Sequence, residues 1–389
     1  MKYPAKTLLL LLCFLLLLAQ GCQNDPPAGE GQENPLPPIE EDYEVSEFKW
    51  GYINQLGDWA IEPAFDDCRN FVEGLAVVRL RGRWGYINNR GKVVIPADYQ
   101  AAWDFSEGLG RVVVFDQGMG FVDREGRMVI QPIWEAASDF SDGMARVQCG
   151  ELYGYINALG DPVIPCGYNR AENFVNGRAV AKKEAKWGMI DKKGNWVIPA
   201  KYEKLDLASD NMVRAKSNGK FGYLDVAGKE LIPFQYEQAW PFAEGLAPVL
   251  EKGLWGLIDK KGAWVVEPAY EDLRYAGYHR WVVAKEGFFG FIEGKGEIVA
   301  PLEYELLLEF REERAPYRKD GLWGFMDTLG LPVTPAQYGL VWSFREGMAR
   351  AGFYEGIGFI DRDGQVSIPP RYLDVRDFSE GLARAQRVE

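Results

Sequence analysis

The sequence contains a single histidine, His279, in 389 residues. A serine or cysteine nucleophile activated by histidine would have to use it, yet the residues around it, 275–281, do not resemble a catalytic motif. The phosphate-binding pattern G-x-x-x-x-G-K-[ST] is also absent. We therefore predict a protein without catalytic activity and without a cofactor. The 57 acidic residues leave one alternative open, a pair of carboxylates that acts on glycosidic bonds.

Cysteine is scarce as well, and its spacing argues against two kinds of site. Cys13 and Cys22 lie near the N-terminus, and no two of the other three, Cys68, Cys149 and Cys166, form a C-x-x-C pair. An odd number without that spacing argues against a metal cage and against a complete disulfide framework. We expect the three to be small buried residues, and a bridge between Cys149 and Cys166 stays open.

The sequence lacks an apolar run long enough to cross a membrane. Its longest run, residues 8–19, spans about 12 residues, whereas a membrane-spanning helix needs roughly 20. Lysines before this run are typical of an export signal. Gly21 and Cys22 after it resemble the lipobox of bacterial lipoproteins, which implies that residues 1–21 are removed and that Cys22 is lipidated. An ordinary signal peptide cut nearby, which would leave a soluble secreted protein, is the alternative.

The segment after the signal predicts a tether. Residues 22–46 are rich in Pro, Glu, Asp, Gln and Gly and contain almost nothing that could pack. Removal of Lys2 and Lys6 with the signal leaves 42 basic against 57 acidic residues, a formal charge of −15. Because binding to nucleic acid begins with a basic face, we exclude a nucleic-acid partner. We expect an envelope location through the N-terminal lipid. Gln23 is not the aspartate that resembles an inner-membrane retention signal, which favours the outer membrane or the surface.

A glycine that follows an aromatic or apolar residue recurs ten times along the rest of the chain. Eight of the nine intervals are 34 residues long and one is 35. These anchor glycines are Gly51, Gly85, Gly120, Gly154, Gly188, Gly222, Gly256, Gly290, Gly324 and Gly358. Each is followed by a second glycine six residues later and by an aromatic residue fourteen residues later. The sequence therefore predicts ten tandem 34-residue units in residues 47–389.

The residues between the glycines predict an all-β unit of about three antiparallel strands. Glycine and proline at such short separations leave no room for helical hairpins of the same period. In the second unit we expect strands at 75–80, 84–88 and 92–95, with Pro96 ending the third. A connection of about a dozen residues follows, in which Phe105 seats the loop on the core.

Two rows of acidic residues recur with the repeat. The link between the second and third expected strands begins with Asp or Asn and ends with Gly, which is the pattern of a type I turn rather than of a metal site. A second row lies 22 residues after the anchor glycines, at Glu73, Glu107, Asp142, Asp210, Glu244, Glu312, Glu346 and Glu380. We interpret this second row as a solvated turn edge rather than a cation site.

The anchor glycine itself predicts a gap in the packing. Strand alternation places Gly85 on the same face as Ile87, whose position is apolar in all ten units, so that face belongs to the core. We expect a large side chain of a neighbouring strand or unit to fill the space at Gly85.

These motifs resemble those of the WG-repeat family, also called KWG repeats. The resemblance is carried by Lys49-Trp50-Gly51-Tyr52-Ile53-Asn54 and by Lys186-Trp187-Gly188-Met189-Ile190-Asp191, and it covers residues 48–389. It implies an all-β fold and a bacterial source, and the family has no single established activity. In five units another apolar or aromatic residue replaces the tryptophan, which indicates packing rather than a ligand site.

A unit of 34 residues cannot bury a core alone, so its stability must come from its neighbours. An open β-superhelix or solenoid satisfies this condition, and so does a closed β-propeller-like array. Ten units exceed the four to eight blades that are typical of propellers, which favours the open form.

The predicted function is a non-catalytic envelope scaffold that binds a protein or polysaccharide partner. The alternative is an enzyme or enzyme-associated module that acts on cell-envelope glycans. A candidate contact surface lies in the seventh unit, where Tyr275, Tyr278, His279 and Trp281 replace the usual Phe and Glu-Gly; drift in a redundant array is the other interpretation. His279 stands where most units have glycine, and histidine tolerates a left-handed backbone, which favours a turn role over catalysis.

Overall fold

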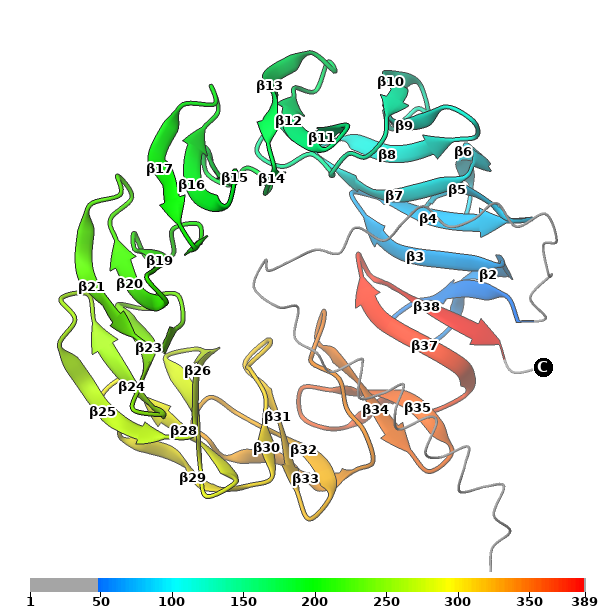
Figure 1. Cartoon of the computed structure of the whole chain (residues 1–389). Coiled ribbons are helices and arrows are strands. Elements are labelled where there is room, and N and C mark those ends of the chain that lie inside the picture. The colour runs from blue at the N-terminus through cyan, green and yellow to red at the C-terminus, as the bar shows by residue number, and fades with distance from the viewer. Residues whose placement is uncertain (1–47, 388–389) are drawn as a thin grey trace, which may run out of the picture. The chain divides into compact units, whose positions relative to one another are not determined.

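The computed structural model describes residues 48–387, which are built entirely from strands and turns. Strands β1 to β38 form ten antiparallel sheets, which are the blades of a closed ring (Figure 1). We number each blade by the repeat unit whose anchor glycine it contains. The described residues include no helix long and apolar enough to span a bilayer. The expected signal peptide (1–21), the expected lipidation site Cys22 and the expected tether (22–46) lie outside the described residues.

Seven blades take four strands each from one continuous stretch of chain, and two take three. The four-stranded blades are, from the inner to the outer strand: β3 (Asp67–Val72), β4 (Leu75–Leu80), β5 (Arg83–Asn88), β6 (Val93–Tyr99); β7 (Ala101–Ser106), β8 (Leu109–Val114), β9 (Gly118–Val122), β10 (Met128–Trp134); β14 (Arg170–Ala171), β15 (Arg178–Lys183), β16 (Lys186–Asp191), β17 (Trp196–Tyr202); β18 (Lys204–Leu205), β19 (Val213–Ser217), β20 (Lys220–Leu224), β21 (Glu230–Tyr236); β22 (Gln238–Ala239), β23 (Leu246–Glu251), β24 (Leu254–Asp259), β25 (Trp264–Tyr270); β26 (Asp272–Gly277), β27 (Arg280–Lys285), β28 (Phe288–Glu293), β29 (Ile298–Tyr304); β30 (Leu306–Leu307), β31 (Ala315–Lys319), β32 (Leu322–Met326), β33 (Pro332–Tyr338). The three-stranded blades, the fourth and the tenth, are β11 (Ala145–Cys149), β12 (Leu152–Ile156), β13 (Pro162–Tyr168); and β34 (Met348–Phe353), β35 (Gly356–Asp361), β36 (Val366–Ile368).

The remaining blade closes the ring with strands from both ends of the described chain. Its order is β37-β38-β1-β2, formed by Tyr372–Ser379, Leu382–Arg387, Trp50–Ile53 and Trp59–Phe65. Strand β38 pairs with β1 in continuous register, from Trp50 opposite Gln386 to Ile53 opposite Ala383. Without this pairing β1 would be an unprotected edge. The closed array, which was the alternative in the sequence analysis, is therefore the correct one, and the favoured open superhelix is wrong.

The innermost strand of each blade was not expected from the sequence. Strand β7 occupies the stretch that we interpreted as a connection, and Figure 1 shows such first strands on the inner side of the ring. Phe105 of β7 is 2% exposed, and its ring meets that of Tyr86 edge-on with 5.0 Å between the centroids. The phenylalanine therefore does seat this segment on the core, but it does so from a strand and not from a loop.

The core of the ring lies between blades, and both faces of a blade are buried. Tyr86 and Ile87 are neighbours in β5 and are each 0% exposed. Ile87 packs in a cluster that the second blade shares with the closing blade, and Tyr86 packs in one that it shares with the third. This arrangement agrees with the prediction that no unit buries a core by itself.

The outer strand bulges over the anchor glycine. Trp84 pairs with Tyr99 and Tyr86 pairs with Ile95, so β6 places extra residues opposite Gly85. Pro96 lies inside this bulge and does not end the strand, because β6 is the blade's outer edge, where proline removes no ladder bond.

The space at Gly85 is filled by backbone. A Cβ atom added there would lie 2.6 Å from the carbonyl oxygen of Ile95 and 2.7 Å from the amide nitrogen of Ala97. At all ten anchor glycines, an added Cβ atom would lie within 2.8 Å of the equivalent carbonyl oxygen. The expected large side chain is therefore absent from the gap at Gly85, whereas at Gly188 the ring of Trp196 in the outer strand reaches the gap beside the backbone. The glycine is required because the bulged backbone comes so close.

Candidate functional surfaces

The first acidic row forms turns, as the sequence predicts. In the fifth blade Asp191 Oδ1 accepts the backbone N–H groups of Lys193 and Asn195, both at 2.9 Å, and the N–H of Gly194 donates to the Asp191 carbonyl. Nine of the ten units repeat this pair of contacts: Asn54, Asn88, Asp123, Asn157, Asp191, Asp225, Asp259, Asp327 and Asp361. These oxygens are therefore engaged by their own turns.

Seven of the eight carboxylates in the second acidic row join one blade to the next through backbone amides. The carboxylate of Glu73 accepts the backbone N–H of Glu107 at 2.8 Å and that of Gly108 at 3.0 Å, in the equivalent turn of the following blade. Further contacts of this kind join Glu107 to Asp142 and Gly143, Asp142 to Gly177, Asp210 to Gly245, Glu312 to Glu346 and Gly347, Glu346 to Glu380 and Gly381, and Glu380 to Gly74. The last contact crosses the closure of the ring. The row lies at a turn edge as expected, but its carboxylates also cap their neighbours' turns.

Four of these acids follow a serine, which adds a second contact between blades. Ser106 Oγ donates to the carbonyl oxygen of Phe140 at 2.8 Å. Ser141, Ser209 and Ser379 make the same contact with Phe174, Phe242 and Phe71. The repeated Phe-Ser-Glu-Gly motif is therefore a clamp between blades. Within residues 48–387 no group of three or more His, Cys, Asp or Glu side chains could hold a metal ion.

Three of the candidate contact residues of the seventh unit, Tyr275, His279 and Trp281, lie at the junction of the seventh and eighth blades, whereas the ring of Tyr278 packs on Phe310 of the next unit. Trp281 is 1% exposed and packs against the ring of Tyr275, with 5.0 Å between the centroids. The hydroxyl of Tyr275 donates to Glu244 at 2.6 Å, and His279 Nδ1 contacts the other carboxylate oxygen of Glu244. Burial therefore removes Trp281 from any contact surface, whereas Tyr278 is 43% exposed.

The backbone at Tyr278 and His279 forms a left-handed turn, as the repeat predicts for His279. Tyr278 and His279 have φ angles of 53° and 58°, so His279 does adopt the left-handed backbone that its position predicts. Glu244 belongs to the second acidic row, and here it contacts side chains in place of backbone amides. A partner-binding role for the cluster stays a prediction.

Side chains that differ from blade to blade line the inner strands. Trp103 of β7 is one of them, and it stands where β3 has Arg69. Arg111 of the adjacent strand β8, at a position that is arginine in five units, stacks on Trp103, with 4.1 Å from its guanidinium carbon to the ring centroid, and its Nε donates to Asp139 at 2.9 Å. Arg350 makes the same stack on Trp342. Burial lowers the pKa of both arginines and raises the pKa of the Asp104 carboxyl. Sequence reasoning missed this surface because it missed the strands that carry it.

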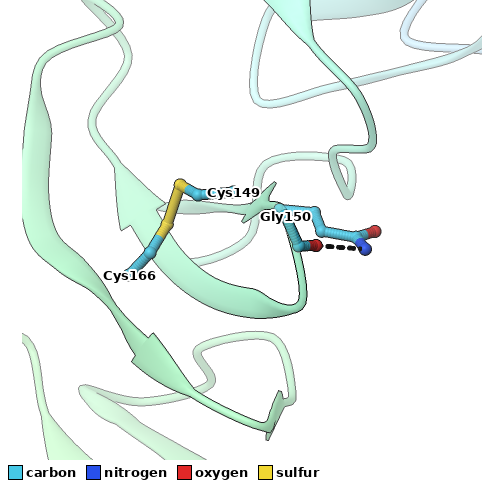
Figure 2. The surroundings of a disulfide bond; sticks show 4 residues. Cys149, Gly150 and Cys166 are labelled. Carbon is cyan, nitrogen blue, oxygen red and sulfur yellow. Dashed lines mark hydrogen bonds between the residues drawn. A yellow bond between two sulfur atoms is a disulfide. The ribbon is translucent and has the colours of Figure 1, made fainter.

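One disulfide, between Cys149 of β11 and Cys166 of β13, joins the first and third strands of the fourth blade (Figure 2). Their Cα atoms are 6.2 Å apart, within the range of about 4.4–6.8 Å that disulfides span. The pairing that the sequence left open is therefore made. The expectation of a small buried thiol holds for Cys68, which is free and buried.

A cavity of about 510 Å³ lies between the tenth blade and the end of β33 in the ninth. Two glycines form part of its wall, Gly339 and Gly352, together with Tyr338 and Tyr354. Tyr354 is fully exposed, at 102% of its reference area. No sequence motif marks this cavity, because it arises from what the repeat lacks there.

The comparison with known families covers the whole ring. A model described as "WG containing repeat" matches ten segments: residues 50–84, 84–114, 119–153, 153–187, 187–221, 221–255, 255–275, 289–323, 323–352 and 357–387. The segments agree with the ten units and their period. Among curated proteins there is no match.

Solved structures offer distant likenesses. The computationally designed Ika8 protein is 15% identical, with a TM-score of 0.36, and the match covers 69% of this chain and 95% of that one. A eukaryotic initiation factor is 10% identical, with a TM-score of 0.46 and coverage of 74% and 95%. BamB from Moraxella catarrhalis is 13% identical, with a TM-score of 0.28 and coverage of 81% and 80%. Likenesses of this size carry no argument about function.

Proposed function

Because this chain belongs to the family of proteins with WG containing repeats, we propose that it is a cell-envelope lipoprotein whose ten-bladed ring binds a protein or polysaccharide partner without catalysis. The observation that carries the proposal is the different use of repeated and non-repeated side chains. Repeated polar groups cap turns and clamp blades, as Glu73 does for the third blade. The side chains that vary, such as Arg69 and Trp103 at equivalent positions, lie on inner strands and can therefore differ without loss of the fold.

The disulfide supports the export step of the proposal. Disulfides form and persist in exported proteins and are rare where thiols are kept reduced. The Cys149–Cys166 bridge is therefore in keeping with an envelope location. The acidic formal charge of the mature chain supports a partner other than nucleic acid.

Lipidation is tested by labelling bacteria that express the full chain with an alkyne-bearing palmitate analogue. We expect the wild type to be labelled and to sediment with membranes, and Cys22→Ser to lose the label. Cys13→Ser is the matched control, because this cysteine lies inside the expected signal, and it should be labelled like the wild type. An unlabelled wild-type protein in the medium would instead mean an ordinary signal peptide.

Binding without turnover is tested with the mature protein immobilised through its N-terminus. It is exposed to purified envelope polysaccharides and to detergent-solubilised envelope proteins, and the retained material is compared with the input by mass spectrometry. We expect saturable retention of one ligand whose mass is unchanged. A shortened glycan or a modified ligand would favour the enzyme alternative and refute the proposal.

A further inference from the structure

The tenth blade departs from the others at one cross-strand pair. Gly339 donates its N–H to the carbonyl of Gly352 at 3.3 Å, so the two residues face each other. The equivalent pair in the ninth blade is Glu305 and Arg318, whose side chains form an ion pair at 3.4 Å. None of the other nine units has glycine at either position. The tenth blade thus lacks both side chains that elsewhere cover this part of the blade.

The missing side chain at Gly339 opens the cavity of about 510 Å³. An ideal Cβ atom placed on Gly339 meets nothing within 4 Å, so the space reaches the backbone. The rings of Tyr338 and Phe353 stand edge to face, with 5.6 Å between the centroids, and both residues line the cavity. This volume lies within the range of about 300–1,000 Å³ that is usual for small-ligand sites.

The rim of the cavity is polar and carries no positive charge. Gln337, Glu355 and Gln365 are exposed and line it beside Tyr354, and no Lys or Arg belongs to the lining. An anionic ligand would therefore find no counter-charge and would face Glu355. Glutamine side chains both donate and accept hydrogen bonds, as sugar hydroxyls do, and aromatic rings offer a flat apolar surface.

We propose that this cavity binds a neutral sugar residue of a polysaccharide, which packs on Tyr354 and Phe353 while its hydroxyls bind Gln337 and Gln365. The inference rests on the proposed function and specifies one of its two partner classes. An aromatic peptide side chain would use the rings but leave the glutamine amides without partners, so the sugar fits the whole lining better.

The test uses the mature protein and three neutral probes, chitohexaose, cellohexaose and mannohexaose, in calorimetric titrations. We expect at least one to bind saturably. Gly339→Glu supplies the residue that five other units carry there, and its side chain has room to enter the cavity. It should weaken binding by about tenfold, as should Tyr354→Ala, which removes an aromatic contact.

The controls separate the site from the fold and from the broader function. Phe288→Ala removes another exposed aromatic side chain, outside the cavity lining, and should leave sugar affinity unchanged, and all three variants should have the melting temperature of the wild type. Equal affinity of the wild type, Gly339→Glu and Tyr354→Ala would overturn this site while leaving polysaccharide binding intact. Absence of sugar binding, with retention of an envelope protein, would overturn the site and leave only the protein branch of the proposed function.

Discussion

Two junctions between blades reach the same packing with different residues. Between the second and third blades, Tyr86 meets Phe105, and the residue across the hairpin from Phe105 is Gly110. Between the seventh and eighth blades, Ala276 takes the place of the phenylalanine and Trp281 takes the place of the small residue. Trp281 then packs with Leu257, which stands where Tyr86 does.

The comparison teaches that the eighth blade exchanges large and small residues across one hairpin. Cores tolerate such changes when total volume is kept, so the ring retains its junction. The contacts of Glu244 are exchanged as well. Its carboxylate contacts the side chains of Tyr275 and His279, whereas the carboxylate of Glu73 accepts hydrogen bonds from backbone amides. The unusual aromatic residues of the seventh unit therefore include two that maintain the junction.

Trp281→Ala should have the largest effect. Removing a tryptophan that is 1% exposed leaves a cavity, and we expect a loss of about 4 kcal/mol in unfolding free energy. Guanidinium unfolding of the mature protein, followed by circular dichroism, measures it. The double variant Trp281→Ala with Ala276→Phe restores the regular pattern and should recover much of the loss. A double variant no more stable than the single one would contradict the exchange of large and small residues.

The anchor glycine should behave alike at both junctions. Added Cβ atoms would lie 2.6 Å from the carbonyl oxygen of Ile95 at Gly85 and 2.6 Å from that of Val266 at Gly256. Because backbone must move, Gly85→Ala and Gly256→Ala should each lower the unfolding free energy by about 3 kcal/mol in the same assay. Gly167→Ala is the matched control, since its nearest atom is 3.8 Å away. A neutral Gly85→Ala would show that the bulge can yield.

The disulfide distinguishes the two three-stranded blades, because the fourth has one and the tenth has none among its described residues. Replacing both Cys149 and Cys166 with serine should lower stability by roughly 2 to 3 kcal/mol, since the bridge closes a loop with a sequence separation of 17 residues. Thermal melting with and without a reductant measures this. Reductant should lower the melting temperature of the wild type and leave the double variant unchanged; equal melting in all samples would mean that the bridge contributes nothing.

Much of the repeat could be predicted from the sequence, because its period, turns and outer three strands depend on local chemistry. Ring closure was only the alternative prediction although the sequence hints at it: the residues before Trp50 lack the apolar pattern of a strand, and Leu382–Arg387 pairs with the first unit instead. The open form was favoured instead, because ten units exceed the four to eight blades that are typical of propellers. The innermost strands were missed because several pair over only two residues, as β14 does, and others are interrupted by a bulge, as between Ala102 and Phe105.

The candidate surfaces were harder to predict than the strands. Gly339 and Gly352 matter only as a cross-strand pair, and the pair exists only once the innermost segment of the blade is recognised. Cys149 and Cys166 are separated by a middle strand, so their approach depends on the local course of three strands. By contrast, the left-handed backbone of His279 follows from its place in the repeat alone.

The smallest expected effect concerns the carboxylates that cap neighbouring turns. A hydrogen bond from Lys192 is the main cause that lowers the pKa of Asp142, and Lys260 does the same for Asp210. Because the pKa is lower in the folded state, this stabilisation is present above the unfolded pKa of about 4 and is lost as pH falls through the folded value.

Asp142→Asn with Asp210→Asn should therefore cost about 1 kcal/mol at pH 7 and less at pH 3, since exposed pairs contribute about 0.5 kcal/mol each. Urea unfolding at the two pH values measures the difference. Glu244→Gln, at the junction where side chains replace the backbone donors, is the comparison variant. An equal loss of stability at pH 3 and pH 7 in the double variant would mean that the charges of these carboxylates do not stabilise the junctions. The hydrogen bonds to backbone amides would then account for the whole effect.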